Sequence, residues 1–118
     1  MSNFAQDCTQ ETNVVDFALD AQNPAEHKLF IRPANPVVGL EIVSFQPSGG
    51  MAEGSNLCIV NDTLNDIVLK HNDASGTAGW RLIMSSGADV TLVPGRPIWG
   101  FLVENSTAHP NGWRFEGL

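Results

Sequence analysis

Three side chains that can take part in catalysis lie close together in the segment LKHNDASGTAGWRL, residues 69–82. His71, Asp73 and Ser75 are the residue types of a catalytic triad, in which the histidine takes a proton from the serine hydroxyl. A working triad is assembled from distant segments, because its three side chains must line up in space. The chain also has no Gly-x-Ser-x-Gly turn to expose a nucleophilic serine. We therefore expect no nucleophilic catalysis here, and we predict that the protein is not an enzyme.

The same segment offers a metal-binding alternative. In jelly-roll metalloenzymes of the cupin type, two ligands one residue apart on a strand point into the barrel, and a His-x-Asp pair with a distant histidine can hold iron. His71 and Asp73 would form this pair. His109 lies in the turn AHPNG, where it is poorly placed to complete the ligand set. A cupin-like metalloenzyme is kept as an alternative, but we expect no metal and no other cofactor.

A structural role explains more of the segment. The side chains of Asn72 and Asp73 are of the kind that bond to nearby backbone and close turns. The glycines that follow allow a tight connection, and the guanidinium of Arg81 can reach Asp73 or the loop carbonyls. We therefore predict that His71, Asn72, Asp73 and Arg81 clamp a turn between two strands.

The elements that would position this turn alternate apolar and polar residues with the period of two that is typical of half-buried strands. Clusters of Gly, Pro, Asn and Asp separate them, and no stretch shows an apolar face at helical period. The predicted strands cover residues 14–20, 28–32, 37–45, 56–61, 66–71, 80–84, 89–93, 98–103 and 112–117. About eight to nine short strands at this spacing favour an all-β fold, either a jelly-roll β-sandwich or a small Greek-key barrel.

The length of 118 residues suits a single domain. Residues 1–13 lack a clear pattern and are predicted to form an N-terminal arm, followed by the β-sandwich domain over residues 14–118. Residues 1–27 contain no Lys or Arg but several carboxylates, so this end either docks on a basic surface or is simply solvated. Phe4, Asp7 and Glu11 are our candidates for contact with a neighbouring protein.

Charge and composition exclude several classes of partner. The formal net charge of -7 argues against binding to a phosphate backbone, so no nucleic-acid partner is expected. No apolar run reaches transmembrane length and no signal peptide is visible, so no membrane partner is expected either. Two cysteines are too few for a disulfide framework and match no zinc motif. Cys58, inside the apolar run LCIV, is expected to be buried in a protein made in a reducing cytoplasm.

The tryptophans Trp80, Trp99 and Trp113 allow two interpretations. Aromatic faces stack on sugars and bind cations, so these side chains could line a ligand site. Their alternating apolar neighbours favour a place in the core or at a subunit interface instead. We take all three as candidate interface aromatics.

The second half of the chain resembles a pattern found in structural proteins of tailed bacteriophages. In that pattern a strand of the type I-x-N leads to I-x-L-x-H-x-D-x-x-S-x-x-x-x-R, and a Gly-Asp turn, an L-x-P-G turn and a closing strand ending near W-R follow. Within about residues 58–117 the matching positions are Ile59, Asn61, Ile67, Leu69, His71, Asp73, Arg81, Gly87, Asp89, Leu92, Pro94, Gly95, Trp113 and Arg114. The serine of the pattern falls at Gly76, one position after Ser75, and its aromatic-Asp pair is replaced by Glu104 and Asn105.

The resemblance implies a β-structured building block in which His71 and Asp73 have structural roles. Phage proteins of this kind include tail fibres, tail-associated proteins and small capsid-bound proteins. A short free-standing β domain with an arm suits a capsid decoration, or cement, protein, which is similar in size, often trimeric, and bridges neighbouring shell subunits.

We therefore expect a virion structural protein that is made in the host cytoplasm and lies on the capsid surface. Its expected partners are the major capsid protein and itself, as a homotrimer. A partner that binds only the mature shell stabilises that shell by mass action, and a trimer amplifies a modest affinity per copy. The alternative is a tail-fibre or adsorption module that binds a host surface glycan through exposed tryptophan.

Overall fold

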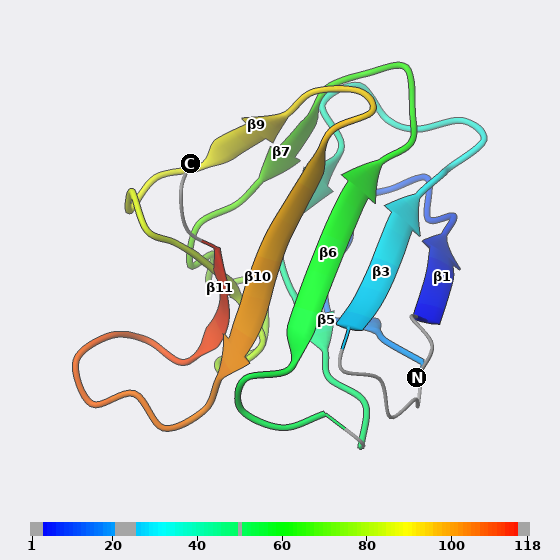
Figure 1. Ribbon diagram of the computed structural model, residues 1–118. Helices are drawn as coiled ribbons and strands as arrows, with labels where there is room; N and C mark the ends of the chain where they lie inside the picture. Colours follow the sequence, from blue (N-terminus) through cyan, green and yellow to red (C-terminus); the bar gives the residue numbers. More distant parts are fainter. Residues whose placement is uncertain (1–3, 21–25, 50, 116–118) are drawn as a thin grey trace.

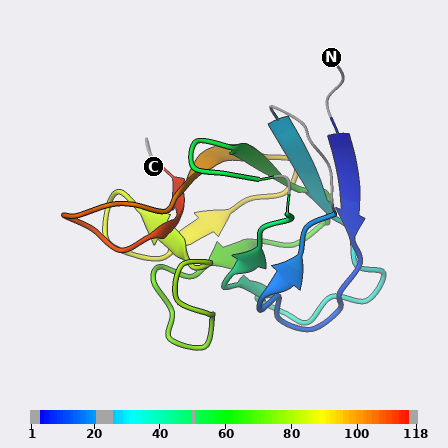
Figure 2. The same cartoon turned by 90° about the horizontal axis from the view of Figure 1, so that it is seen from below.

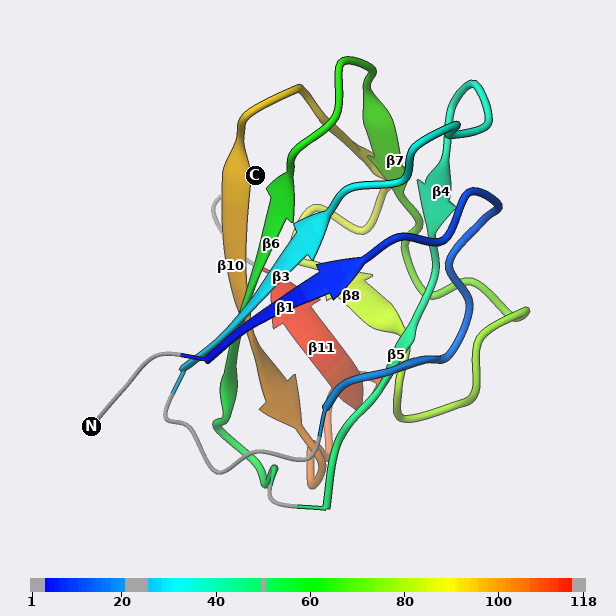
Figure 3. The same cartoon turned by 90° about the vertical axis from the view of Figure 1, so that its right-hand side faces the viewer.

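The chain folds into short β-strands arranged in two layers (Figures 1 and 3). The computed structural model describes residues 4–20, 26–49 and 51–115. Its strands are β1 (Phe4–Cys8), β2 (Phe17–Ala18), β3 (Glu26–Ile31), β4 (Glu41–Ile42), β5 (Phe45–Gln46), β6 (Asn56–Asn61), β7 (Ile67–Leu69), β8 (Leu82–Met84), β9 (Val90–Leu92), β10 (Pro97–Val103) and β11 (Gly112–Phe115). The predicted all-β class is confirmed. The described part of the chain contains no helix that could cross a membrane.

One layer is a six-stranded sheet with the order β1-β3-β6-β10-β11-β8, called the large sheet below. The second layer combines the three-stranded sheet β4-β7-β9 with the pair β2-β5. Figure 1 looks onto the large sheet with the second layer behind it, and Figure 3 shows the layers from the side. Loops 72–80 and 104–111 project from the body of the protein in the view from below (Figure 2).

The first half of the chain winds back and forth between the two layers. Strands β1, β3 and β6 come from successive passes and pair in parallel within the large sheet. The intervening strands pair in parallel in the second layer, as β2 with β5 and β4 with β7. Parallel neighbours need a long crossover, and here each crossover passes through the opposite layer.

The second half of the chain closes the fold with antiparallel pairs. Strand β10 lies antiparallel to both β6 and β11, and β9 lies antiparallel to β7. The pairing as a whole is mixed, because β8 joins the edge of the large sheet parallel to β11. A jelly roll or Greek-key barrel is built from antiparallel strands, so the parallel pairs were not expected from the sequence.

The predicted N-terminal arm is wrong for Phe4–Cys8, because these residues form the edge strand β1. The strand pairs with β3 from Phe4 opposite His27 to Cys8 opposite Ile31, and the Cys8 side chain is fully buried. The domain therefore begins at or before Phe4; residues 1–3 lie outside the described part. The sequence did not show the apolar–polar alternation of this strand, because the polar Gln6 occupies an inward position. Its Oε1 lies 2.8 Å from Nε2 of His27.

The acidic residues of the expected arm contact their own chain. Asp7 forms an ion pair with Arg32, with 2.7 Å between Oδ1 and Nη1. The Oε2 atom of Glu11 accepts a hydrogen bond of 3.1 Å from the backbone N–H of Asn35. These carboxylates fasten the start of the chain to the segment after β3, and their contact with a neighbouring protein stays a prediction.

The core lies between the layers, and its largest fully buried side chains are Trp113, Phe45 and Phe115. Trp113 belongs to the large sheet, and its indole N–H donates a hydrogen bond of 3.0 Å to the Phe45 carbonyl in the second layer. With no exposed surface, Trp113 is a core residue, and its assignment to an interface is wrong. The expected burial of Cys58 is confirmed, and Cys8 and Cys58 are both free thiols.

Candidate binding face and the loop over residues 69–82

The outward side of the large sheet carries a row of side chains that run from buried Cys58 and half-buried Lys28 to exposed Ala5 and Trp99. Ala5, Lys28, Cys58 and Trp99 are neighbours in register across β1, β3, β6 and β10, so their side chains emerge on the same side of the sheet. Trp99 keeps 48% of its surface exposed. The ammonium of Lys28 lies 6.0 Å from the centroid of the Trp99 ring, within reach of a cation–π contact.

Half-buried apolar side chains surround this row. Phe30 and Val60 are opposite each other on β3 and β6, while Phe101 follows Trp99 on the outward side of β10. The guanidinium of Arg32 covers the Phe30 ring at 4.3 Å from its centroid. We define the outer face by Lys28, Phe30, Val60, Trp99 and Phe101. The residues on the solvent side of a sheet are normally polar. The aromatic outer face is therefore a candidate binding surface.

Trp80 differs from the other tryptophans. It is partly buried in the loop before β8, and its carbonyl accepts a hydrogen bond of 3.0 Å from the Phe45 N–H. The candidate interface aromatics thus separate into a core residue, Trp113, a loop residue, Trp80, and an exposed residue, Trp99. Trp99 is the tryptophan whose ring is exposed on the sheet.

In the loop over residues 69–82, Asn72 and Asp73 organise the backbone. Asn72 adopts a left-handed conformation, with φ of 45°, and its N–H donates to the Leu82 carbonyl at 2.8 Å. Asp73 accepts hydrogen bonds from the Ser75 N–H at 2.9 Å and from the Ser75 hydroxyl at 2.5 Å. The serine hydroxyl therefore donates to the aspartate, whereas a triad would direct it at the histidine.

His71 and Arg81 fasten the two ends of this loop. The backbone N–H of His71 donates to Oδ1 of Asp89 at 2.7 Å, and its ring Nδ1 accepts from the Met84 N–H at 2.9 Å. Nε of Arg81 donates to the Gly76 carbonyl at 2.8 Å, so this guanidinium closes the loop on itself. Among the described residues, no group of three His, Cys, Asp or Glu side chains is arranged to hold a metal ion.

Asp16 is the anchor of this loop that the sequence did not indicate. Its carboxylate accepts hydrogen bonds from the Ser44 hydroxyl at 2.6 Å, the Thr77 N–H at 3.0 Å and the Thr77 hydroxyl at 2.6 Å. Burial works to raise the pKa of Asp16, but the hydrogen bonds from Ser44 and Thr77 and the charge of Arg81 hold that pKa below its usual value. Asp16 thereby joins the first half of the chain to the loop.

Close packing at the same point explains a glycine. A Cβ atom on Gly76 would lie 2.7 Å from the Cβ and Oγ atoms of buried Ser44, so the loop backbone can approach this closely only without a side chain. The serine that the phage pattern places at this position would not fit without movement of the loop.

No protein-family model, curated protein or solved structure matches this chain.

A buried histidine makes the stability of the fold sensitive to pH. His27 is 1% exposed on the inward side of β3, and burial, opposed in part by the charge of Asp20, lowers its pKa below the usual 6.5. Because the unfolded chain takes up this proton first, protonation favours unfolding. The contribution is fully present above about pH 6.5 and is lost as the pH falls toward the folded pKa, with a slope of at most about 1.4 kcal/mol per pH unit.

We expect His27→Gln to flatten the fall in the free energy of unfolding between about pH 7 and pH 5. The amide can still donate to Gln6 but does not titrate in this range. Urea unfolding at a series of pH values measures the effect, with His109→Gln, at an exposed position, as the matched control. Equal slopes in the wild type and His27→Gln would show that another group is responsible.

Proposed function

We propose that the protein is a structural component of a tailed-bacteriophage virion, a decoration protein that binds the mature capsid shell through the outer face. The observation that carries the proposal is the exposed ring of Trp99, held among apolar neighbours on a rigid sheet. Tryptophan is enriched among the few residues that carry most of the binding energy at protein interfaces. The outer face replaces the N-terminal arm as the surface that meets the shell.

The positions that carry the phage resemblance support a structural module. Ile59, Leu69 and Leu92 are buried in the core, and Gly87 and Gly95 adopt positive φ angles of 76° and 78° in turns. These are roles in folding, so the pattern describes a scaffold on which a binding surface is carried. The fold in the proposal is a two-layered β-sandwich whose mixed strand pairing departs from the antiparallel jelly roll.

We expect Trp99→Ala to weaken binding to mature empty capsids by at least about tenfold, the loss that follows when a central interface tryptophan is truncated. Leu64→Ala is the matched control, because Leu64 is 94% exposed, lies in the loop after β6 and is not one of the residues of the outer face. Co-sedimentation with capsids of the phage that encodes the protein measures binding, and circular dichroism checks the fold.

Binding should depend on the maturation of the shell, and the protein should be a trimer. Wild type should bind mature shells and not immature ones, and light scattering should give the mass of a trimer, which multiplies the affinity of each copy. Full binding by Trp99→Ala would remove the outer face from the interface. Failure of wild type to bind mature shells would overturn the decoration role itself.

The second candidate is an adsorption module that binds a host surface glycan. Exposed Trp99 beside the Lys28 ammonium favours this candidate. The aromatic ring can stack on a sugar, and the ammonium can donate hydrogen bonds to the sugar oxygens. Selective glycan-array signals that are lost in Trp99→Ala, together with no binding to capsids, would favour this candidate over decoration.

A further inference from the structure

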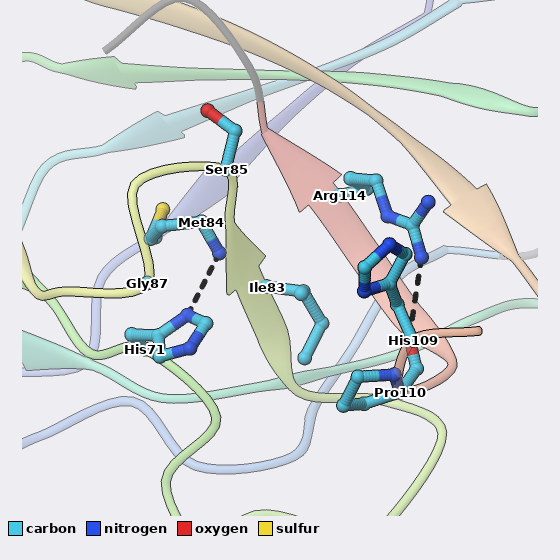
Figure 4. A pocket seen from close by; sticks show the side chains of 8 residues that line it. All are labelled: His71, Ile83, Met84, Ser85, Gly87, His109, Pro110 and Arg114. Carbon is cyan, nitrogen blue, oxygen red and sulfur yellow. Dashed lines mark hydrogen bonds between the residues drawn. The ribbon is translucent and has the colours of Figure 1, made fainter.

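A hollow of about 340 Å³ lies at the end of the large sheet formed by β8 and β11 (Figure 4). It is lined by His71, His109 and Arg114, together with the apolar side chains of Ile83 and Pro110. Its volume is near the lower end of the range for pockets that bind small molecules. Figure 4 shows His71 on one side of Ile83 and His109 with Arg114 on the other.

Arg114 has no carboxylate partner among the described residues, a property that it shares with Lys28, Arg81 and Arg96 but not with Arg32 and Lys70. Arg32 and Lys70 each lie within 4.0 Å of two carboxylates, but no carboxylate of a described residue is within that distance of Arg114. A guanidinium has five N–H donors. Nη2 of Arg114 is directed at the Pro110 carbonyl, at 3.5 Å, which is long for a hydrogen bond.

His71 offers the hollow a hydrogen-bond donor in addition to the Arg114 guanidinium, and its hydrogen bond with Met84 shows which ring nitrogen is the donor. Nδ1 accepts from the Met84 N–H, so in the neutral ring the proton is on Nε2, which becomes a donor. His109 is held on the far wall by its own loop, since its N–H donates to Oγ of Ser106 at 3.1 Å. Within the described part of the chain, no carboxylate lines the hollow.

We propose that this hollow binds a small ligand through a carboxylate or phosphate group. The planar fork of Arg114 matches the paired oxygens of these groups, and Nε2–H of His71 adds a donor from the opposite wall. Ile83 and Pro110 provide an apolar surface for the body of the ligand. Trp99 does not line this site, although Arg114 is opposite Phe101 of the outer face in the register of β10 and β11, and the site goes beyond the proposed binding to a capsid.

The test is a titration of the isotope-labelled full chain, followed by the amide signals of Met84, Gly87 and Arg114. The probes are inorganic phosphate, the carboxylated sugar N-acetylneuraminic acid, and glucose as the neutral control, all at low ionic strength because salt screens the interaction. We expect saturable shifts with phosphate or the carboxylated sugar and none with glucose. Tighter binding of the sugar would show that the apolar wall contributes, and phosphate alone would identify a site for the anionic group.

Arg114→Gln should weaken binding by at least about tenfold, because the charge-assisted hydrogen bonds are lost. Arg96→Gln removes the same charge at an exposed position outside the hollow and should leave binding unchanged. His109→Gln, in an exposed loop, should also weaken binding and serves as a second variant if Arg114→Gln disturbs the fold. Absence of saturation, or equal losses in Arg96→Gln and Arg114→Gln, would overturn the proposal.

Discussion

Replacement of Trp113 by alanine is expected to remove a large part of the stability of the fold. The side chain has no exposed surface and is among the largest fully buried side chains of the protein. Truncation of a buried tryptophan to alanine costs about 3–5 kcal/mol, because packing is lost and a cavity remains. The change also leaves the buried Phe45 carbonyl without the indole donor, at a further cost of about 1–3 kcal/mol. Since domains of this kind have a total stability of about 5–15 kcal/mol, the variant should be close to unfolding.

Two further variants separate packing from hydrogen bonding at this position. Trp113→Phe keeps an aromatic ring but has no N–H to donate, and it should cost less than the alanine variant. Trp99→Ala removes the same side chain from an exposed site and should cost below about 1 kcal/mol. Urea unfolding followed by circular dichroism measures all three, because fluorescence would change with the tryptophan content. A cost below about 1 kcal/mol for Trp113→Ala would mean that the layers are not held together through this ring.

The sequence predicted strands well where polar turns end an alternating run. The predicted strand over residues 56–61 has the same bounds as β6, and the run 98–103 lies within β10. Strand β1 was missed, because Gln6 occupies an inward position and bonds to His27 there. Parallel pairing was also not predicted, since a crossover through the opposite layer leaves no local signal in the chain.

The candidate site was harder to predict than the strands. Both sides of β10 carry apolar residues, with Ile98 and Leu102 inward and Trp99 and Phe101 outward. The two-residue period of the strand therefore does not show which side faces the core. The choice is made by packing against the second layer. Asp16 was missed for a similar reason, because its partner Thr77 is distant in sequence and no local pattern connects them.

A buried asparagine at the end of β6 connects the turn after this strand to the end of β9, and we expect a change to its amide to destabilise the fold. Asn61 is 0% exposed, and its Nδ2 donates to the carbonyls of Asn65 at 2.9 Å and Leu92 at 2.8 Å. Its Oδ1 accepts from the N–H of Thr63 at 3.1 Å and from the Thr63 hydroxyl at 2.7 Å. The side chain thus ties the turn after β6 to the end of β9.

Asn61→Asp is expected to cost at least about 3 kcal/mol at neutral pH, because the carbonyls of Leu92, which is buried, and of Asn65 lose their donors and face a carboxylate of nearly the same shape. Asn65→Ala is the matched control: it keeps the backbone carbonyl that Asn61 uses and removes an exposed side chain, so it should cost below about 0.5 kcal/mol.

The pH dependence of the Asn61→Asp penalty distinguishes the cost of a buried charge from the cost of the lost hydrogen-bond donors. Burial against carbonyl oxygens raises the folded-state pKa of the new carboxyl above its unfolded value of about 3.9. The folded variant then binds the proton more tightly than the unfolded chain, so its deficit relative to wild type shrinks as the pH falls toward about 4. A protonated carboxyl also regains one donor for a carbonyl. Urea unfolding of both proteins at each pH measures the difference, and a penalty that stays constant from pH 7 to about pH 4 would show that the charge of the new carboxylate is not what destabilises the variant.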